Sequence, residues 1–270
     1  AADPNADASI KDMHLLGNGA GAAGISAKNP ALEKLLLPDS LTYIDVDALA
    51  VFQSLKTIEV NVGNPVFAGH MGTLLMTNDF EQSVQDAEGV TVAYIPSAMR
   101  NVELPEHATG IFSEAAPYAK GVAGFHVPEA NTHLTSTADL LLRSQEDDSL
   151  AVALRAAAAG TATVIPETAT LNDQALPVTT IDAGAFSASA VQLSSIVSPA
   201  VITSIAAQTT VVIDDEEQQN TPPAFEQATV EKATVALAST DEEATAVWAE
   251  AGFTSFTQIG QAGSQETLES

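Results

Sequence analysis

The chain has 270 residues and a formal net charge of −26, because 35 acidic residues face only nine Lys and Arg. Nucleic acids and anionic membranes are bound through clustered cations, and these nine form no cluster, so we expect neither as a direct partner. Hydrophobic residues make up 46% of the chain, which excludes acidic disorder and predicts a buried core. The absence of cysteine excludes disulfides and thiol chemistry.

The acidic surface also predicts a salty environment. Unpaired carboxylates repel one another at low ionic strength, whereas molar salt reduces the Debye length to about 3 Å and removes most of that repulsion. The imbalance is greatest in the second half of the chain, where 15 acids follow Arg155 and the only cation is Lys232. We therefore expect the C-terminal part to form the most ion-exposed surface.

Residues 1–28 are predicted to form an extended N-terminal arm. Within it, Gly19, Gly21 and Gly24 match the GxGxxG spacing of dinucleotide-binding folds, and Asp45 follows where such folds place a ribose-binding acid. The motif needs a strand before it and a helix after it. The apolar stretch before it is too short for a strand, and Asn29–Pro30 interrupts the helix, so we interpret the segment as a glycine-rich arm without a cofactor.

Helices are predicted from caps and apolar spacing. Asn29 can cap a short helix over Pro30–Leu37, and further helices are expected over 45–56, 137–145, 147–160 and 241–251. Strands are predicted where Val, Thr and Ile are frequent: 57–62, 90–95, 110–113, 121–127, 162–165, 176–181 and 209–213.

The repeated interruption of these strands by proline favours short antiparallel strands over long βαβ units. We expect a β-rich α+β fold, with an antiparallel sheet or barrel body, a few short helices and extended terminal arms. The alternative is an all-β jelly-roll sandwich. The main body would span 29–213, an acidic, proline-containing loop 214–225, and a C-terminal segment with a helix and polar tail 226–270. No internal repeat is evident in the sequence.

Two further segments bear on ions and membranes. Asp214, Asp215, Glu216 and Glu217 are the densest carboxylate group, and oxygen ligands of this kind suit calcium or a monovalent cation. Residues 183–213 carry no charge and are long enough to span a bilayer. Their many Ser, Thr and Gln residues and the central Pro199 argue against a transmembrane segment.

No catalytic constellation is evident. The five histidines, His14, His70, His107, His126 and His133, do not match a zinc-protease motif, and GxSxG is absent. An enzyme would require polar groups such as Arg100, His107, His126 or His133 to converge in a pocket. We therefore expect a non-enzymatic protein.

The favoured interpretation is a self-assembling structural protein, a virion shell subunit from a halophilic or marine system. Its partners would be copies of itself and other shell proteins, contacted through the arm 1–28 and the tail 261–270. A cell-surface or surface-layer protein, or an extracellular binding module, is the alternative. A salt-adapted enzyme with an unrecognised site is the third interpretation.

Overall fold

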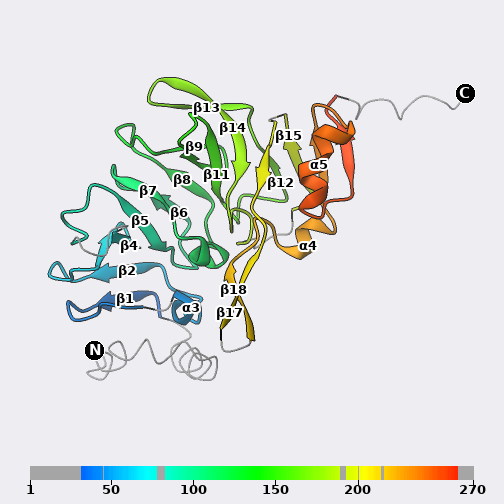
Figure 1. Ribbon diagram of the computed structural model, residues 1–270. Helices are drawn as coiled ribbons and strands as arrows, with labels where there is room; N and C mark the ends of the chain where they lie inside the picture. Colours follow the sequence, from blue (N-terminus) through cyan, green and yellow to red (C-terminus); the bar gives the residue numbers. More distant parts are fainter. Residues whose placement is uncertain are drawn as a thin grey trace, which may run out of the picture.

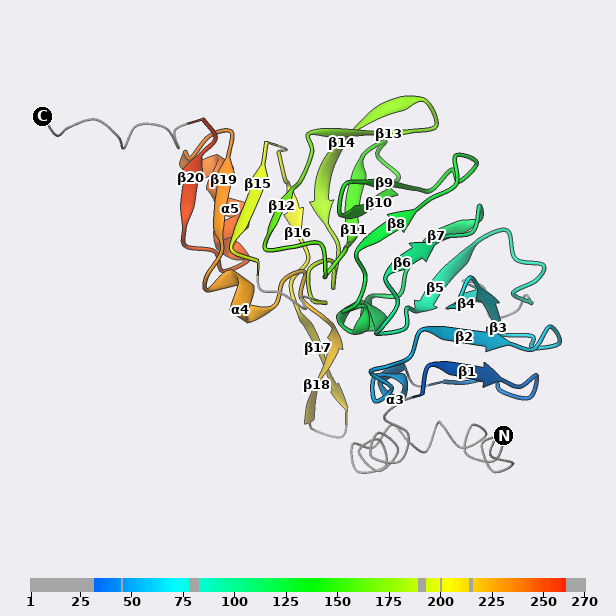
Figure 2. The same cartoon turned by 180° about the vertical axis from the view of Figure 1, so that it is seen from behind.

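The computed structural model describes residues 32–44, 46–77, 83–188, 193–199, 201–213 and 216–260. Strands dominate this part of the chain and helices are few and short, so the predicted β-rich α+β class is confirmed. The predicted N-terminal arm and polar tail lie outside the described residues. The strands follow one another in a curved stack that runs from β1 at one end to β20 at the other (Figures 1 and 2).

Two ladders of strands make up this stack. Within the described residues, eight of the 14 strand pairs are parallel, which corrects the expectation of an antiparallel body. The first ladder contains β5 (Val90–Tyr94), β7 (Ala108–Ile111), β11 (Leu150–Arg155), β14 (Gln174–Ile181) and β16 (Ser204–Ile205). The second is divided into three sheets that do not pair with one another: β1 (Lys34–Leu37) with β2 (Thr57–Val60), β6 (Asn101–Glu103) with β8 (Gly124–His126), and the four strands β12 (Ala162–Val164), β15 (Ser195–Ser198), β19 (Thr234–Leu237) and β20 (Phe256–Gln258).

From β5 to β16 the chain alternates between the two ladders, so it winds as a coil around a shared core. Antiparallel hairpins and short helices are inserted into the coil. The hairpins are formed by β3 (Phe67–His70) with β4 (Thr73–Thr77), β9 (Leu134–Thr137) with β10 (Leu140–Ser144), β13 (Thr168–Leu171) with β14, and β17 (Thr209–Ile213) with β18 (Glu216–Thr221). The helices are α3 (Val46–Leu49), the 3₁₀ helix η2 (Ser113–Tyr118), α4 (Gln227–Val230) and α5 (Glu242–Glu250).

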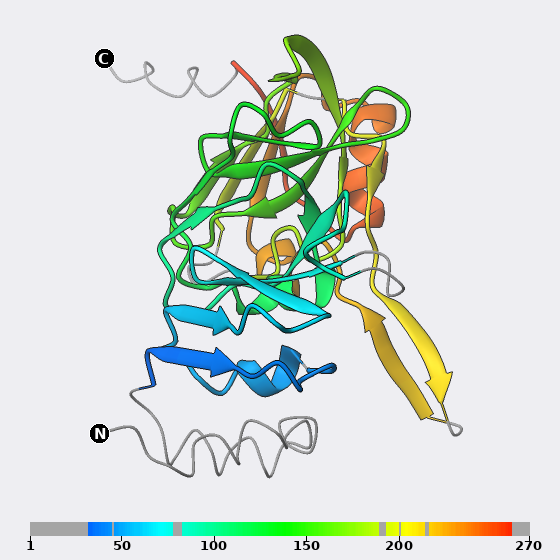
Figure 3. The same ribbon diagram turned by 90° about the vertical axis from the view of Figure 1, so that its left-hand side faces the viewer.

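The β17–β18 hairpin extends away from the body of the molecule (Figure 3). It occupies most of the segment that we expected to be an acidic loop over 214–225, because Glu216–Thr221 pairs with Thr209–Ile213. The expectation of a loop throughout this segment was therefore wrong. The proposed domain boundary at this segment stays a prediction.

A duplicated unit is visible in the structure although no repeat was evident in the sequence. A shift of 67 residues places Lys34 of β1 on Asn101 of β6, and the same shift superposes β2 on β8, β3 on β9 and β4 on β10. Over these 44 aligned positions only nine residues are identical, at Leu37, Pro38, Thr42, Ile44, Ala48, Val60, Asn64, Leu74 and Leu75 of the first copy. The two copies share the order and spacing of their strands far more than their side chains.

A buried asparagine holds the same place in both copies. The Asn64 Nδ2 donates to the carbonyl oxygens of Pro38 and Leu41 at 2.9 and 2.7 Å, and its Oδ1 accepts from two backbone N–H groups of the following residues. Asn131 repeats this pattern with the carbonyls of Pro105 and Ala108, both at 3.0 Å. In each copy the two carbonyls lie 26 and 23 residues before the asparagine. We call these two residues the asparagine clamps.

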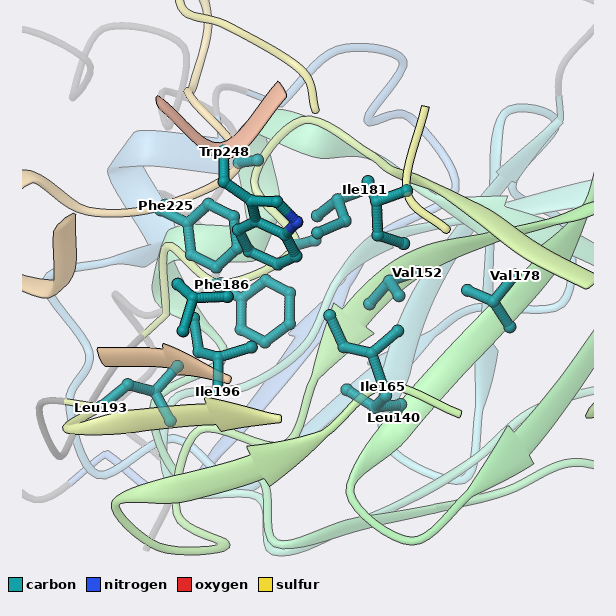
Figure 4. Close-up of a cluster of buried hydrophobic side chains, with 14 of the residues drawn as sticks. Leu140, Val152, Ile165, Val178, Ile181, Phe186, Leu193, Ile196, Phe225 and Trp248 are labelled. Atoms are coloured by element: carbon teal, nitrogen blue, oxygen red, sulfur yellow. The ribbon is translucent and has the colours of Figure 1, made fainter. Parts of the chain in front are cut away.

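The core lies between the ladders and forms three consecutive clusters along the stack. At the C-terminal end, inward residues of the first ladder such as Val152 and Val178 share a cluster with Ile196 and Val235 of the second. Figure 4 shows Trp248, Phe225 and Phe186 grouped together in this cluster. Phe186 stacks on Phe225 with ring centroids 4.6 Å apart, and Trp248 meets Phe253 edge-on at 5.6 Å.

Several predicted helices are strands. The segment 30–37 contains β1, the segment 137–145 contains β10, and the alanine-rich segment 147–160 contains β11, all six residues of which are buried. The helix predicted over 241–251 is confirmed as α5, and that over 45–56 is reduced to the single turn α3. Each predicted strand overlaps a strand of the structure: β2, β5, β7, β8, β12, β14 and β17.

Candidate functional site

The predicted cation site is only partly described. Asp214 and Asp215 lie outside the described residues, and Glu216 and Glu217 are placed only through the backbone of β18. Among the residues that the structure describes, no three His, Asp or Glu side chains come together as a metal site. Binding of calcium or a monovalent cation at 214–217 therefore stays a prediction. The glycines of the GxGxxG match and Asp45 also lie outside the described residues.

Three of the four described histidines, His70, His107 and His126, lie near Glu103, and His133 lies at the second asparagine clamp. His70 ends β3, and burial lowers its pKa, with a smaller contribution in the same direction from His107 and an opposing one from Glu103. His126 lies beside Glu103 in the ladder between β6 and β8. His133 belongs to the second asparagine clamp, where its backbone N–H binds Asn131 at 2.8 Å. Arg100, His107, His126 and His133 line neither of two pockets in the described part of the chain, and the enzyme interpretation stays a prediction.

The strongest candidate for an interaction site is the outward side of the last four strands of the second ladder. Strands β12, β15, β19 and β20 are parallel and adjacent, and the ladder register aligns their outward residues in two rows. We call this surface the uncharged sheet face. The first row is Ala162, Ser195, Thr234 and Ser255, and the second is Val164, Val197, Ala236 and Thr257.

Side chains on this face are small, partly or fully exposed, and free of charge. Thr234 and Ser255 form a hydroxyl hydrogen bond of 3.1 Å across neighbouring strands. Val164 is 54% exposed. The alternate residues point inward, where Ile196 and Val235 are fully buried in the core. Strand alternation therefore separates a largely apolar interior, which includes the buried Thr163 and Ser198, from a neutral exterior.

This neutral face contrasts with the net charge of −26 that the chain carries as a whole. The acids of this region lie elsewhere, for example Glu242, Glu243 and Glu250 on α5. Toward the N-terminal end, the outward side of the second ladder is charged, with Lys34 and Glu59 paired at 2.6 Å. The uncharged sheet face lies in the C-terminal part, which we expect to form the most ion-exposed surface, and that expectation stays a prediction. The uncharged run 183–213 was the sequence signal for this face, since it includes β15.

A second candidate lies on the first ladder, at the seam between β7 and β11, where two sheets meet in contact without pairing. A pocket of about 330 Å³ opens there. We call it the seam pocket, and its lining residues are Thr91, Ile111, Phe112, Ser113, Arg143, Ala153, Asp182 and Ala183.

Arg143 extends across the seam pocket and forms a bidentate ion pair with Asp182. Its Nε and Nη2 donate to the two carboxylate oxygens at 3.0 and 3.1 Å, and Nη1 donates to the Ser144 carbonyl at 3.2 Å. Arg143 leaves β10 and reaches beyond β11 to the end of β14, and small residues of β11 such as Ala151 and Ala153 leave room for it. Both charged side chains remain partly exposed.

The other internal arginine is structural. Arg155 is 2% exposed and its Nε donates to Asp139 at 2.8 Å, while Nη2 donates to the Gly160 carbonyl at 2.7 Å. Burial lowers the pKa of Arg155, and Asp139 opposes that shift. Asp139 also accepts from the Thr163 hydroxyl at 3.2 Å. This network joins the β9–β10 turn to β11 and β12, and it is closed to ligands.

No protein-family model matches the chain, and no curated protein matches it. Two solved structures are similar. The pneumococcal vaccine antigen PcpA is 15% identical with a TM-score of 0.39, over 83% of this chain and 55% of that one. A leucine-rich cell surface protein from Faecalibacterium prausnitzii A2-165 is 12% identical with a TM-score of 0.24, over 86% and 80% of the two chains. At these values neither likeness carries an argument about function.

None of the described helices combines the length and the apolar character needed to cross a bilayer.

Proposed function

We propose that this protein is a non-enzymatic interaction module that works at a cell surface, and that a partner docks on the uncharged sheet face. The observation that carries the proposal is the neutrality of eight outward positions on four adjacent strands of a strongly acidic chain. Burying a charge without a partner is costly, and the centres of protein interfaces are depleted of charged residues. A neutral face of small Val, Ala, Ser and Thr residues can be covered without that cost.

The acidic surface outside this face supports a location outside the cell. Nine cations can neutralise at most nine of the 35 acids, so the remainder keeps the protein hydrated and repels anionic surfaces. This combination suits a molecule that is exposed to an ionic medium and binds through one neutral patch. The cell-surface alternative is favoured over the virion shell on these grounds.

The virion shell interpretation stays a prediction. It depends on contacts made by residues 1–28 and 261–270, both of which lie outside the described residues. The geometry of the described body favours a single neutral docking face.

Two matched valine substitutions test the docking face. Val164 lies on it and is 54% exposed, whereas Val201 lies outside it and is 78% exposed. We expect Val164→Arg to weaken binding of the fluorescently labelled protein to intact cells of its source organism at least about tenfold, since the arginine would be buried unpaired in the contact. Val201→Arg should bind as the unmodified protein does.

Because both valines are exposed, neither substitution should alter the thermal unfolding midpoint appreciably. Equal binding by the two variants, at unchanged stability, would contradict the assignment of this face. Absence of cell binding by the unmodified protein would contradict the proposed function as a whole.

A further inference from the structure

The seam pocket has a chemistry of its own, and it lies on the first ladder, whereas the uncharged sheet face belongs to the second. Three kinds of group line it: a charged pair, hydroxyl-bearing side chains and an apolar wall. Ligand sites commonly combine an apolar wall with a few convergent polar groups. The identity of those groups restricts the class of ligand.

The charged pair presents donors and acceptors without net charge. Arg143 and Asp182 have opposite charges and are joined by two hydrogen bonds. A guanidinium has five N–H groups, and the bonds to Asp182 and Ser144 use three of them. Two N–H donors and the remaining carboxylate lone pairs are therefore available to a ligand. Polar ligands with both donors and acceptors on adjacent atoms fit such a pair.

The apolar part of the pocket includes an exposed aromatic ring. Phe112 is 37% exposed and follows Ile111 at the end of β7. The neighbouring Ser113 directs its hydroxyl hydrogen to Glu114 at 2.8 Å, so its oxygen lone pairs remain capable of accepting. A ring beside hydroxyl and guanidinium groups favours a ligand that has one apolar face and polar edges.

Charge excludes two other ligand classes. An anion would be repelled by a protein of net charge −26. It would also find no free cation in the pocket, because Arg143 is the only cation that lines it and is already paired with Asp182. A cation would have to compete with Arg143 for the same carboxylate. A neutral ligand avoids both costs.

We propose that the seam pocket binds a neutral sugar residue of a glycan. A pyranose ring has C–H groups on one face that can pack on Phe112, and vicinal hydroxyls that can both donate to Asp182 and accept from Arg143. A volume of about 330 Å³ suits one ring rather than an extended chain. This site is separate from the uncharged sheet face and does not depend on the function proposed for it.

Saturation-transfer difference NMR on the full chain tests the proposal. The neutral probes are the methyl glycosides of glucose, galactose, mannose and N-acetylglucosamine, and the charged comparators are glucuronate and spermidine. We expect saturation of at least one neutral glycoside. Its signal should fall at least about fivefold in Phe112→Ala and in Arg143→Gln.

Tyr43→Ala is the matched control, because Tyr43 is an exposed aromatic residue, 64% accessible, that does not line the pocket. It should leave the signal unchanged. The proposal is overturned if no neutral glycoside is saturated, if only glucuronate or spermidine is, or if the signal survives both pocket substitutions. Circular dichroism of each variant checks that the fold is retained. If Arg143→Gln is unstable, Phe112→Ala alone tests the proposal, because its ring is partly exposed.

Discussion

One buried asparagine holds neighbouring segments of backbone together in each copy of the duplicated unit. Each asparagine clamp satisfies two carbonyls of one coil and two N–H groups of the next turn of chain with a single buried side chain. A buried polar group that loses its partner costs about 1–3 kcal/mol. The clamps therefore hold in place the loops that lead into β3 and β9.

Replacement of Asn131 by alanine should expose this role. The substitution removes four hydrogen bonds, and the Pro105 carbonyl keeps only its bond from the Ala108 N–H, so we expect a loss of about 2–4 kcal/mol in the free energy of unfolding. Urea denaturation followed by circular dichroism measures it. Asn101→Ala, at an exposed position of β6, is the control and should cost less than about 0.5 kcal/mol. Similar losses in the two variants would show that the clamp contributes no special stability.

The clamps were not predicted from the sequence, because an asparagine followed by a strand is equally typical of an ordinary turn. The candidate sites were largely missed for a related reason. Arg143 and Asp182 are 39 residues apart, and no local pattern indicates that they meet. Only the lack of charge over 183–213 indicated the uncharged sheet face, and it did so for one of the four strands.

At the scale of elements, prediction succeeded where local signals agreed with tertiary contacts. Helix α5 has an Asp241 cap, whose carboxylate accepts from the Ala244 N–H at 2.8 Å, and acids in its first turn. The helix prediction failed for β11, because a strand buried on both faces forms a continuous apolar run that cannot be distinguished from a buried helix by its sequence. Pairing of β11 with β10 and β14 overrides the helix preference of its alanines.

The duplicated unit was hidden in the sequence because only nine of its 44 aligned positions are identical. Successive strands of the ladders are separated by 18 residues between Val90 and Ala108 but by 39 between Ser195 and Thr234. Inserted hairpins and helices change the length of the successive coils, so the duplicated unit does not continue as a constant period along the rest of the chain. The parallel pairing that results is equally hidden, because alternation predicts a strand without indicating its partner.

Helix α5 closes the C-terminal core through Trp248. Its ring lies 1% exposed among Phe225 and Phe253. We expect Trp248→Ala to lower the free energy of unfolding by about 3–5 kcal/mol, as is usual for large aromatic truncations in a core. Tyr43→Ala serves as the exposed aromatic control and should have little effect. A loss below about 1 kcal/mol for Trp248→Ala, measured by urea denaturation, would mean that α5 is loosely attached to the stack.

At the scale of the whole molecule, charge separates into an acidic exterior and one neutral face. Carboxylates in such excess repel one another in the folded state, and salt screens that repulsion. We expect the thermal unfolding midpoint to rise markedly between 50 mM and 2 M NaCl. Differential scanning fluorimetry measures it, and a midpoint independent of salt would show that bound ions or pairing already neutralise the charge.

The stack explains how one chain can carry two separate surfaces. The uncharged sheet face belongs to the second ladder and the seam pocket to the first. The hydrophobic core lies between them, so a substitution at one surface does not touch the other. Under this account the protein acts as a scaffold with a flat neutral face for one partner and a polar pocket for a small neutral ligand.

Location tests the central claim most directly. Antibodies raised against the purified protein should label intact, unpermeabilised cells of the source organism, and brief protease treatment of those cells should remove the label. This is the result expected of an interaction module that works at the cell surface. Label that is confined to released virus particles, or that appears only after the cells are permeabilised, would contradict the account.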